Sequence, residues 1–170
     1  MSNTDRADEI PEVLDEAEAG LSEIVSNEGT PLATFELANV HTRRAYRGMN
    51  SDRDGADAEV KRALQLLNET VSSDAPSPIA VLAFTNAVIL QAALDVLGGR
   101  APDGNLIAKG LEVLGETVPG NDATYDIANR AILLTAQGNR ESARPLVEYL
   151  ASIRYRSDAY ERMMELFTDR

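Results

Sequence analysis

One stretch of the chain, residues 79–97, is apolar at almost every position. It reads IAVLAFTNAVILQAALDVL, in which only Thr85, Asn86, Gln91 and Asp95 are polar. A helix of this composition is apolar on all its faces, so we expect it to be the central buried helix of an all-helical domain. The polar residues in its middle and second half favour a core helix over a helix that crosses a membrane. We expect Asn86, in the middle of this helix, to be buried.

Elsewhere the apolar residues recur at spacings of three and four, as on one face of a helix. No segment shows the strict alternation that is typical of a strand. We therefore predict an all-α fold of about seven to eight helices, stacked as antiparallel pairs in one domain over residues 1–170. The expected helices cover about 10–26, 31–47, 57–71, 78–97, 105–117, 122–137, 140–152 and 158–167.

Capping residues mark several of these boundaries. Thr30 before Pro31 and Ser77 before Pro78 each place a hydroxyl at the N-cap and a proline in the first helical turn. Asn121 is the expected cap of the helix that follows it.

The sequence also contains an internal repeat pattern. Residues 21–40 align with residues 67–88 when one gap is allowed, and a shorter third copy runs from Leu114 to Asn129. Both longer copies contain Leu-x-Glu-x-Val, a polar turn, a hydroxyl residue with proline, and an asparagine eight residues after that proline. The pattern predicts helix pairs that stack on one another. The predicted units are 10–47, 57–99 and 104–137, followed by C-terminal helices at 139–168.

The spacing between copies places the chain near a known class of helical repeats. Leu21, Leu67 and Leu114 are 46 and then 47 residues apart, at the upper end of the range of HEAT and armadillo repeats. The chain thus resembles a short HEAT-like helical array over roughly residues 10–137. The resemblance implies stacked helix pairs and identifies no specific family.

The composition indicates the type of organism and the cellular compartment. The net charge is −12, Lys61 and Lys109 are the only lysines in the sequence, and cysteine is absent. An acidic, lysine-poor chain resembles proteins of salt-loving archaea, whose charged surfaces stay soluble at high salt. The lack of cysteine excludes disulfides and thiolate metal sites. The acidic start, MSNTDRADEI, does not resemble a secretory signal, so we expect a cytoplasmic protein.

The asparagines of the three copies are the first candidate site. Asn39, Asn86 and Asn129 occupy matching positions, and could form a polar row that binds a peptide or another ligand. Alternatively, each buried amide hydrogen-bonds the interhelical turn of the neighbouring unit and serves structure alone.

The densest basic patch is the second candidate site. His41, Arg43, Arg44 and Arg47 lie near the end of one predicted helix and could hold a phosphate or an acidic segment of a partner. The alternative is that these cations complement the helix dipole and pair with nearby acids. His41 as a catalytic base would need a nucleophile or carboxylate, and none is spaced near it in the sequence.

Arginine and tyrosine also mix near the C-terminus, as they do on nucleic-acid-binding surfaces. Arg140 and Arg144 share one helical face, and the wider set adds Tyr149, Arg154, Tyr155, Arg156, Tyr160 and Arg162. The alternative is a pair of amphipathic helices that closes the domain and leaves its arginines in solvent.

Residues 50–61 approach the pattern of a calcium-binding loop. Asn50 at its first position and Lys61 at its last, where a bidentate glutamate belongs, favour an ordinary connector whose acids cap the next helix. The chain has no phosphate-binding glycine loop, zinc-ligand spacing or serine–histidine–acid arrangement. We expect no cofactor and no resident metal.

Three functions are compatible with these patterns. The first is a non-enzymatic interaction or scaffold module of a halophile, which binds a protein partner through its helical surface, with a homodimer as a further option. The second is a regulatory or nucleic-acid-associated protein that uses its arginine clusters. The third is a helical enzyme with an acidic metal site.

Overall fold

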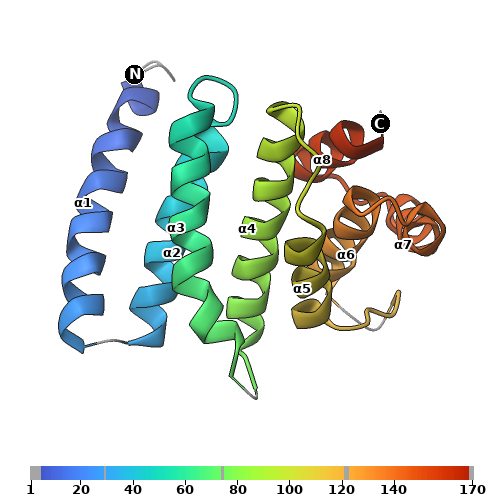
Figure 1. Ribbon diagram of the computed structural model, residues 1–170, viewed down its shortest axis with the longest axis horizontal. Coiled ribbons are helices and arrows are strands. Elements are labelled where there is room, and N and C mark those ends of the chain that lie inside the picture. Colours follow the sequence, from blue (N-terminus) through green and yellow to red (C-terminus); the bar gives the residue numbers. More distant parts are fainter. Residues whose placement is uncertain (1–4, 29, 74, 121–122, 169–170) are drawn as a thin grey trace.

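The computed structural model describes residues 5–28, 30–73, 75–120 and 123–168, and within these ranges it contains helices and no strand. The all-α prediction is confirmed. Figure 1 shows the helices side by side, from α1 at one end of the molecule to α7 at the other. Their bounds are α1 Asp5–Glu28, α2 Pro31–Gly48, α3 Arg53–Val71, α4 Pro78–Leu97, α5 Gly104–Leu114, α6 Thr124–Ala136, α7 Arg140–Ser152 and α8 Asp158–Thr168.

The two predicted hydroxyl caps are confirmed. Thr30 Oγ1 accepts a hydrogen bond from the Ala33 backbone N–H at the start of α2, and Ser77 Oγ accepts one from Ala80 N–H at 3.2 Å at the start of α4. Each satisfies a backbone donor that the first helical turn leaves without a partner.

Three other helix starts differ from the prediction. Helix α1 begins at Asp5, five residues before the predicted start. Helix α3 begins at Arg53, because Asp52 Oδ1 accepts from Gly55 N–H at 3.0 Å and so caps the helix before residue 57. Helix α6 begins at Thr124, and its N-cap residue, Ala123, provides no side-chain hydrogen bond. The predicted cap, Asn121, lies outside the described residues.

The helices pack mainly against their neighbours in sequence, and α2, α4 and α6 also contact one another in a row. Helix α3 packs against both α2 and α4, and α5 packs against both α4 and α6. Helix α7 lies against α6, whereas α8 turns back and packs on α4 and α6. Helices α3 and α5 thus each bridge two helices of the α2–α4–α6 row. The C-terminal helix, α8, packs on α4 and α6 of the same row.

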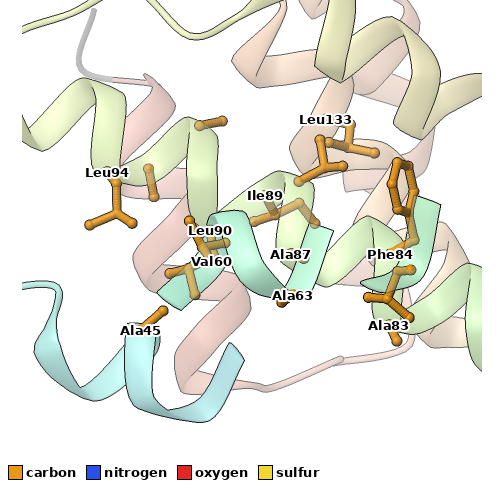
Figure 2. Close-up of a cluster of buried hydrophobic side chains, with 14 of the residues drawn as sticks. Ala45, Val60, Ala63, Ala83, Phe84, Ala87, Ile89, Leu90, Leu94 and Leu133 are labelled. Atoms are coloured by element: carbon orange, nitrogen blue, oxygen red, sulfur yellow. The ribbon is translucent and has the colours of Figure 1, made fainter. Parts of the chain in front are cut away.

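Helix α4 is the centre of the core, as its apolar sequence predicts. Figure 2 shows its Leu90 close to Val60 of α3 and its Ala87 close to Ala63 of α3. The helix is long and apolar enough to span a bilayer by length and composition, but 72% of its most apolar window is buried inside the protein. A helix that neighbours cover on several sides needs apolar residues on several faces, which accounts for its composition.

The contact between α5 and its neighbours depends on a glycine. A Cβ atom at Gly110 would lie 3.2 Å from Val88 Cγ1 and 3.3 Å from Leu133 Cδ1. Glycine therefore lets the α5 backbone approach α4 and α6 more closely than a residue with a side chain would.

Candidate functional site

A groove of about 570 Å³ lies between α1, α2, α4, α6 and the start of α8. This volume falls within the usual range of ligand pockets. Each of α2, α4 and α6 contributes lining residues that are three and four positions apart and so share one helical face. The groove is lined by Val13, Leu14, Thr42, Arg43, Tyr46, Arg47, Asn86, Ile89, Leu90, Tyr125, Ala128, Asn129, Ile132, Tyr155, Ser157, Ala159, Tyr160 and Met163.

The walls of the groove are mostly apolar. Ile89 and Ile132 form its floor as buried residues of α4 and α6, and Met163 adds a buried side chain from α8. Large apolar side chains exposed to solvent also gather here, among them Val13, at 59% exposure, and Tyr125, at 63%. Exposed apolar residues that adjoin a concave apolar surface are typical of binding sites.

Three tyrosines form one end of the groove. The rings of Tyr125 and Tyr155 meet edge to face at 6.4 Å between centroids, and Tyr155 meets Tyr160 in the same way at 5.5 Å. Arg154, whose φ of 55° is left-handed, ends the turn after α7 directly before Tyr155. Burial raises the pKa of the Tyr160 hydroxyl above its ordinary value, so this hydroxyl stays protonated as a hydrogen-bond donor.

Two of the three candidate asparagines, Asn86 and Asn129, meet in the groove. Asn129 Nδ2 donates hydrogen bonds to Asn86 Oδ1 at 2.9 Å and to Thr85 Oγ1 at 3.0 Å. The prediction that Asn86 is buried is wrong, because Asn86 lies in the groove and is exposed there. Asn39 is half-buried on α2 and is not part of the lining.

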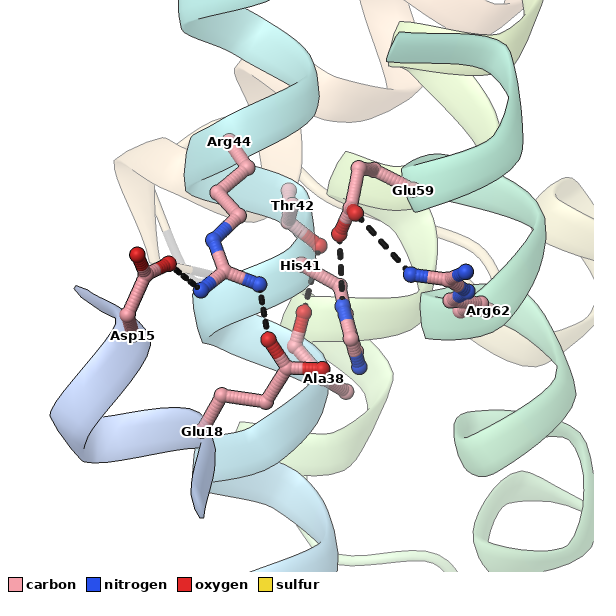
Figure 3. A network of polar contacts seen from close by, with 8 residues as sticks. All are labelled: Asp15, Glu18, Ala38, His41, Thr42, Arg44, Glu59 and Arg62. Atoms are coloured by element: carbon pink, nitrogen blue, oxygen red, sulfur yellow. Dashed lines mark hydrogen bonds and ion pairs between the residues drawn. The ribbon is translucent and has the colours of Figure 1, made fainter. Parts of the chain in front are cut away.

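The basic patch on α2 separates in three directions, and Figure 3 shows two of them, those of Arg44 and His41. Arg44 points to α1, where it pairs with Asp15 and Glu18. The hydrogen bond from Arg44 lowers the pKa of the Glu18 carboxyl below its ordinary value, so the pair is ionised at neutral pH. Arg43 and Arg47 are exposed and line the groove.

His41 takes the third direction, toward α3. Its Nδ1 lies 2.6 Å from Glu59 Oε2, and Glu59 also pairs with Arg62. His41 is buried and lines a second, smaller cavity between α1, α2 and α3. The alternative of pairing with nearby acids therefore describes His41 and Arg44, but not Arg43 and Arg47.

The C-terminal arginines do not gather on one surface. Arg140 donates to the Thr168 carbonyl at 2.8 Å, and Arg144 is exposed one turn further along α7. Arg156 pairs with Glu161. Arg162 donates to Asn50 Oδ1 and lies 5.7 Å from the centroid of the Tyr46 ring, which holds α8 beside the end of α2.

Two acids of the calcium-like segment, Asp52 and Asp57, have protein partners. Asp52 caps α3, and Asp57 pairs with Lys61 and accepts from Gln91 Nε2 at 2.9 Å. Across the described residues, no three side chains of His, Cys, Asp or Glu lie close enough together to hold a metal ion.

Sequence reasoning missed most of the apolar lining. Tyr125, Asn129 and Ile132 are spaced by four and three residues on α6 and mark one helical stripe. That spacing shows that they share a face, but does not show which stripe of a core helix stays uncovered.

No protein-family model, curated protein or solved structure matches this chain.

Proposed function

We propose that this protein is a non-enzymatic interaction module that binds an apolar segment of a protein partner in the groove. The observation that carries the proposal is the groove itself, a concave apolar surface built from one face each of α2, α4 and α6. If the helix pairs are repeats, this row of equivalent helices is the surface on which such arrays bind their partners.

The chemistry of the lining supports a binding role. Within the described residues, the lining contains amide, phenol, hydroxyl and guanidinium groups but no carboxylate, imidazole or thiol. General acid–base catalysis near neutral pH usually relies on histidine or a carboxylate. The apolar floor offers a place where a partner's side chains would leave water, which is the main favourable term in association.

The proposal can be tested by filling the groove. Short peptides selected from a random display library on the wild-type protein in molar salt are expected to bind there. Ala159→Trp places an indole at an exposed position of the lining and should weaken these peptides by at least about tenfold. Isothermal titration calorimetry measures the change.

Ala151→Trp is the matched control, because Ala151 is exposed on α7 and is not part of the lining. It should leave peptide affinity unchanged. Equal affinity of the selected peptides for both variants, or no enrichment over an unrelated acidic protein, would contradict the proposal. So would a homodimer in sedimentation experiments that Ala159→Trp dissociates and Ala151→Trp does not.

A further inference from the structure

Two cations of the groove lack partners within the protein. Arg43 and Arg47 lie one turn apart on α2, and neither has a hydrogen-bonding or acidic partner among the described residues. Other arginines, such as Arg44, Arg62 and Arg156, do form ion pairs. In a chain with a net charge of −12, two adjacent guanidinium groups without acids form a local positive site.

The asparagine pair has unused hydrogen-bonding capacity. Asn129 Nδ2 directs its two hydrogens to Asn86 Oδ1 and Thr85 Oγ1. Thr85 Oγ1 in turn donates to Leu82 O, which fixes its orientation. Within the described residues, Asn129 Oδ1 and Asn86 Nδ2 have no partner, so one acceptor and one donor remain on groove-lining residues.

This combination matches a main-chain peptide group, which has one N–H donor and one C=O acceptor. In a bound helix those groups already hydrogen-bond within the helix, apart from its ends. Only an extended segment offers them to a side-chain amide in the middle of its length. The asparagines therefore favour an extended ligand over a helical one.

We propose that the partner segment is an extended peptide with apolar side chains and a carboxylate. Arg43 and Arg47 bind the carboxylate, the Asn86–Asn129 pair binds one peptide group, and Ile89, Ile132 and Met163 receive the apolar side chains. This inference rests on the proposed function. A guanidinium matches a carboxylate in shape and charge, so the two arginines suit a carboxylate ligand.

A nucleic-acid ligand fits these observations less well. Nucleic acids are bound by tracks of cations that follow many phosphates, whereas two arginines line this groove. Most of the remaining lining is apolar. A hydrated phosphate backbone above it would leave these apolar side chains in contact with water.

Selected acidic peptides and their Asp→Asn or Glu→Gln forms provide the test. Arg43→Gln and Arg47→Gln together should weaken the acidic form by about tenfold or more and leave the neutral form nearly unchanged. The coupling in this double-mutant cycle assigns the carboxylate to the arginine pair. Arg144→Gln, at an exposed position outside the lining, is the control and should change neither.

The main-chain contact has its own test. Asn86→Leu replaces an exposed side chain, so the protein should stay folded by circular dichroism while peptide affinity falls by about tenfold. In a scan of singly N-methylated peptides, one position should lose affinity for the wild-type protein and show little further loss with the variant. If no N-methylated position is coupled to Asn86, the peptide-group assignment is wrong.

The outcomes separate the two proposals. Peptides that bind without an acid, are blocked by Ala159→Trp and are unaffected by the arginine changes overturn this inference and leave the proposed function standing. If no groove-dependent peptide is found, both fail. An oligothymidine that binds more tightly than the peptides and is lost with the arginine changes overturns both in favour of a nucleic-acid site.

Discussion

Phe84→Ala is expected to lower the free energy of unfolding by about 3–5 kcal/mol. Phe84 is 1% exposed in the middle of the core that α4 shares with α3, α5 and α6. Removing its ring takes away buried apolar surface and leaves a cavity that close-packed neighbours fill only in part. Chemical denaturation followed by circular dichroism measures the change.

Ile79→Ala on the same helix is the control for Phe84→Ala. Ile79 is 57% exposed, so its truncation should alter the free energy of unfolding by about 0.5 kcal/mol or less. Similar losses for the two variants would contradict the central position of α4, because they would mean that burial on this helix does not determine stability.

Phe167→Ala is expected to release α8, with a local cost of about 3 kcal/mol. Phe167 is 2% exposed and belongs, with Met163, to the core around α4. Because α8 forms one wall of the groove, its release should also abolish binding of the selected peptides. Amide hydrogen exchange in α8 should accelerate by about a hundredfold, while exchange in α3 changes far less.

Phe167→Leu keeps most of the apolar volume and should cost less than about 1.5 kcal/mol. It should therefore retain peptide binding. If Phe167→Ala leaves α8 protected from exchange and the groove active, the packing of α8 on α4 and α6 does not hold this wall in place.

The fold was predictable because its main determinants are local. The apolar stretch at 79–97 predicts a core helix, and the hydroxyl–proline pairs at Thr30 and Ser77 predict the starts of α2 and α4. The starts of α1, α3 and α6 were predicted less well, and in α6 the N-cap residue is Ala123, which has no capping side chain. Local signals therefore locate a helix better than they locate its first residue.

The groove was predictable only in part. The sequence singled out Arg43, Arg47, Asn86 and Asn129 from their types and spacing, and these four do line one cavity. It grouped them with His41 and Arg44, which point elsewhere, because neighbouring residues on a helix project about 100° apart.

The wrong prediction for Asn86 has a related cause. A helix that is apolar on every side gives no sign of which position its neighbours leave uncovered. That depends on α6 and α8, whose contributing residues, such as Asn129 and Tyr160, lie far along the chain. The exposure of Asn86 is therefore determined by tertiary packing, and the sequence pattern of α4 alone does not predict it.

The central claim is that the groove binds a peptide segment, and methyl NMR of the wild-type protein titrated with a selected peptide tests it most directly. We predict chemical-shift changes concentrated at groove methyls, those of Ile89, Leu90, Ile132 and Met163. Shifts confined to exposed apolar residues outside the lining, Leu32, Ile79 and Val118, or no shifts at saturating peptide, would contradict the claim.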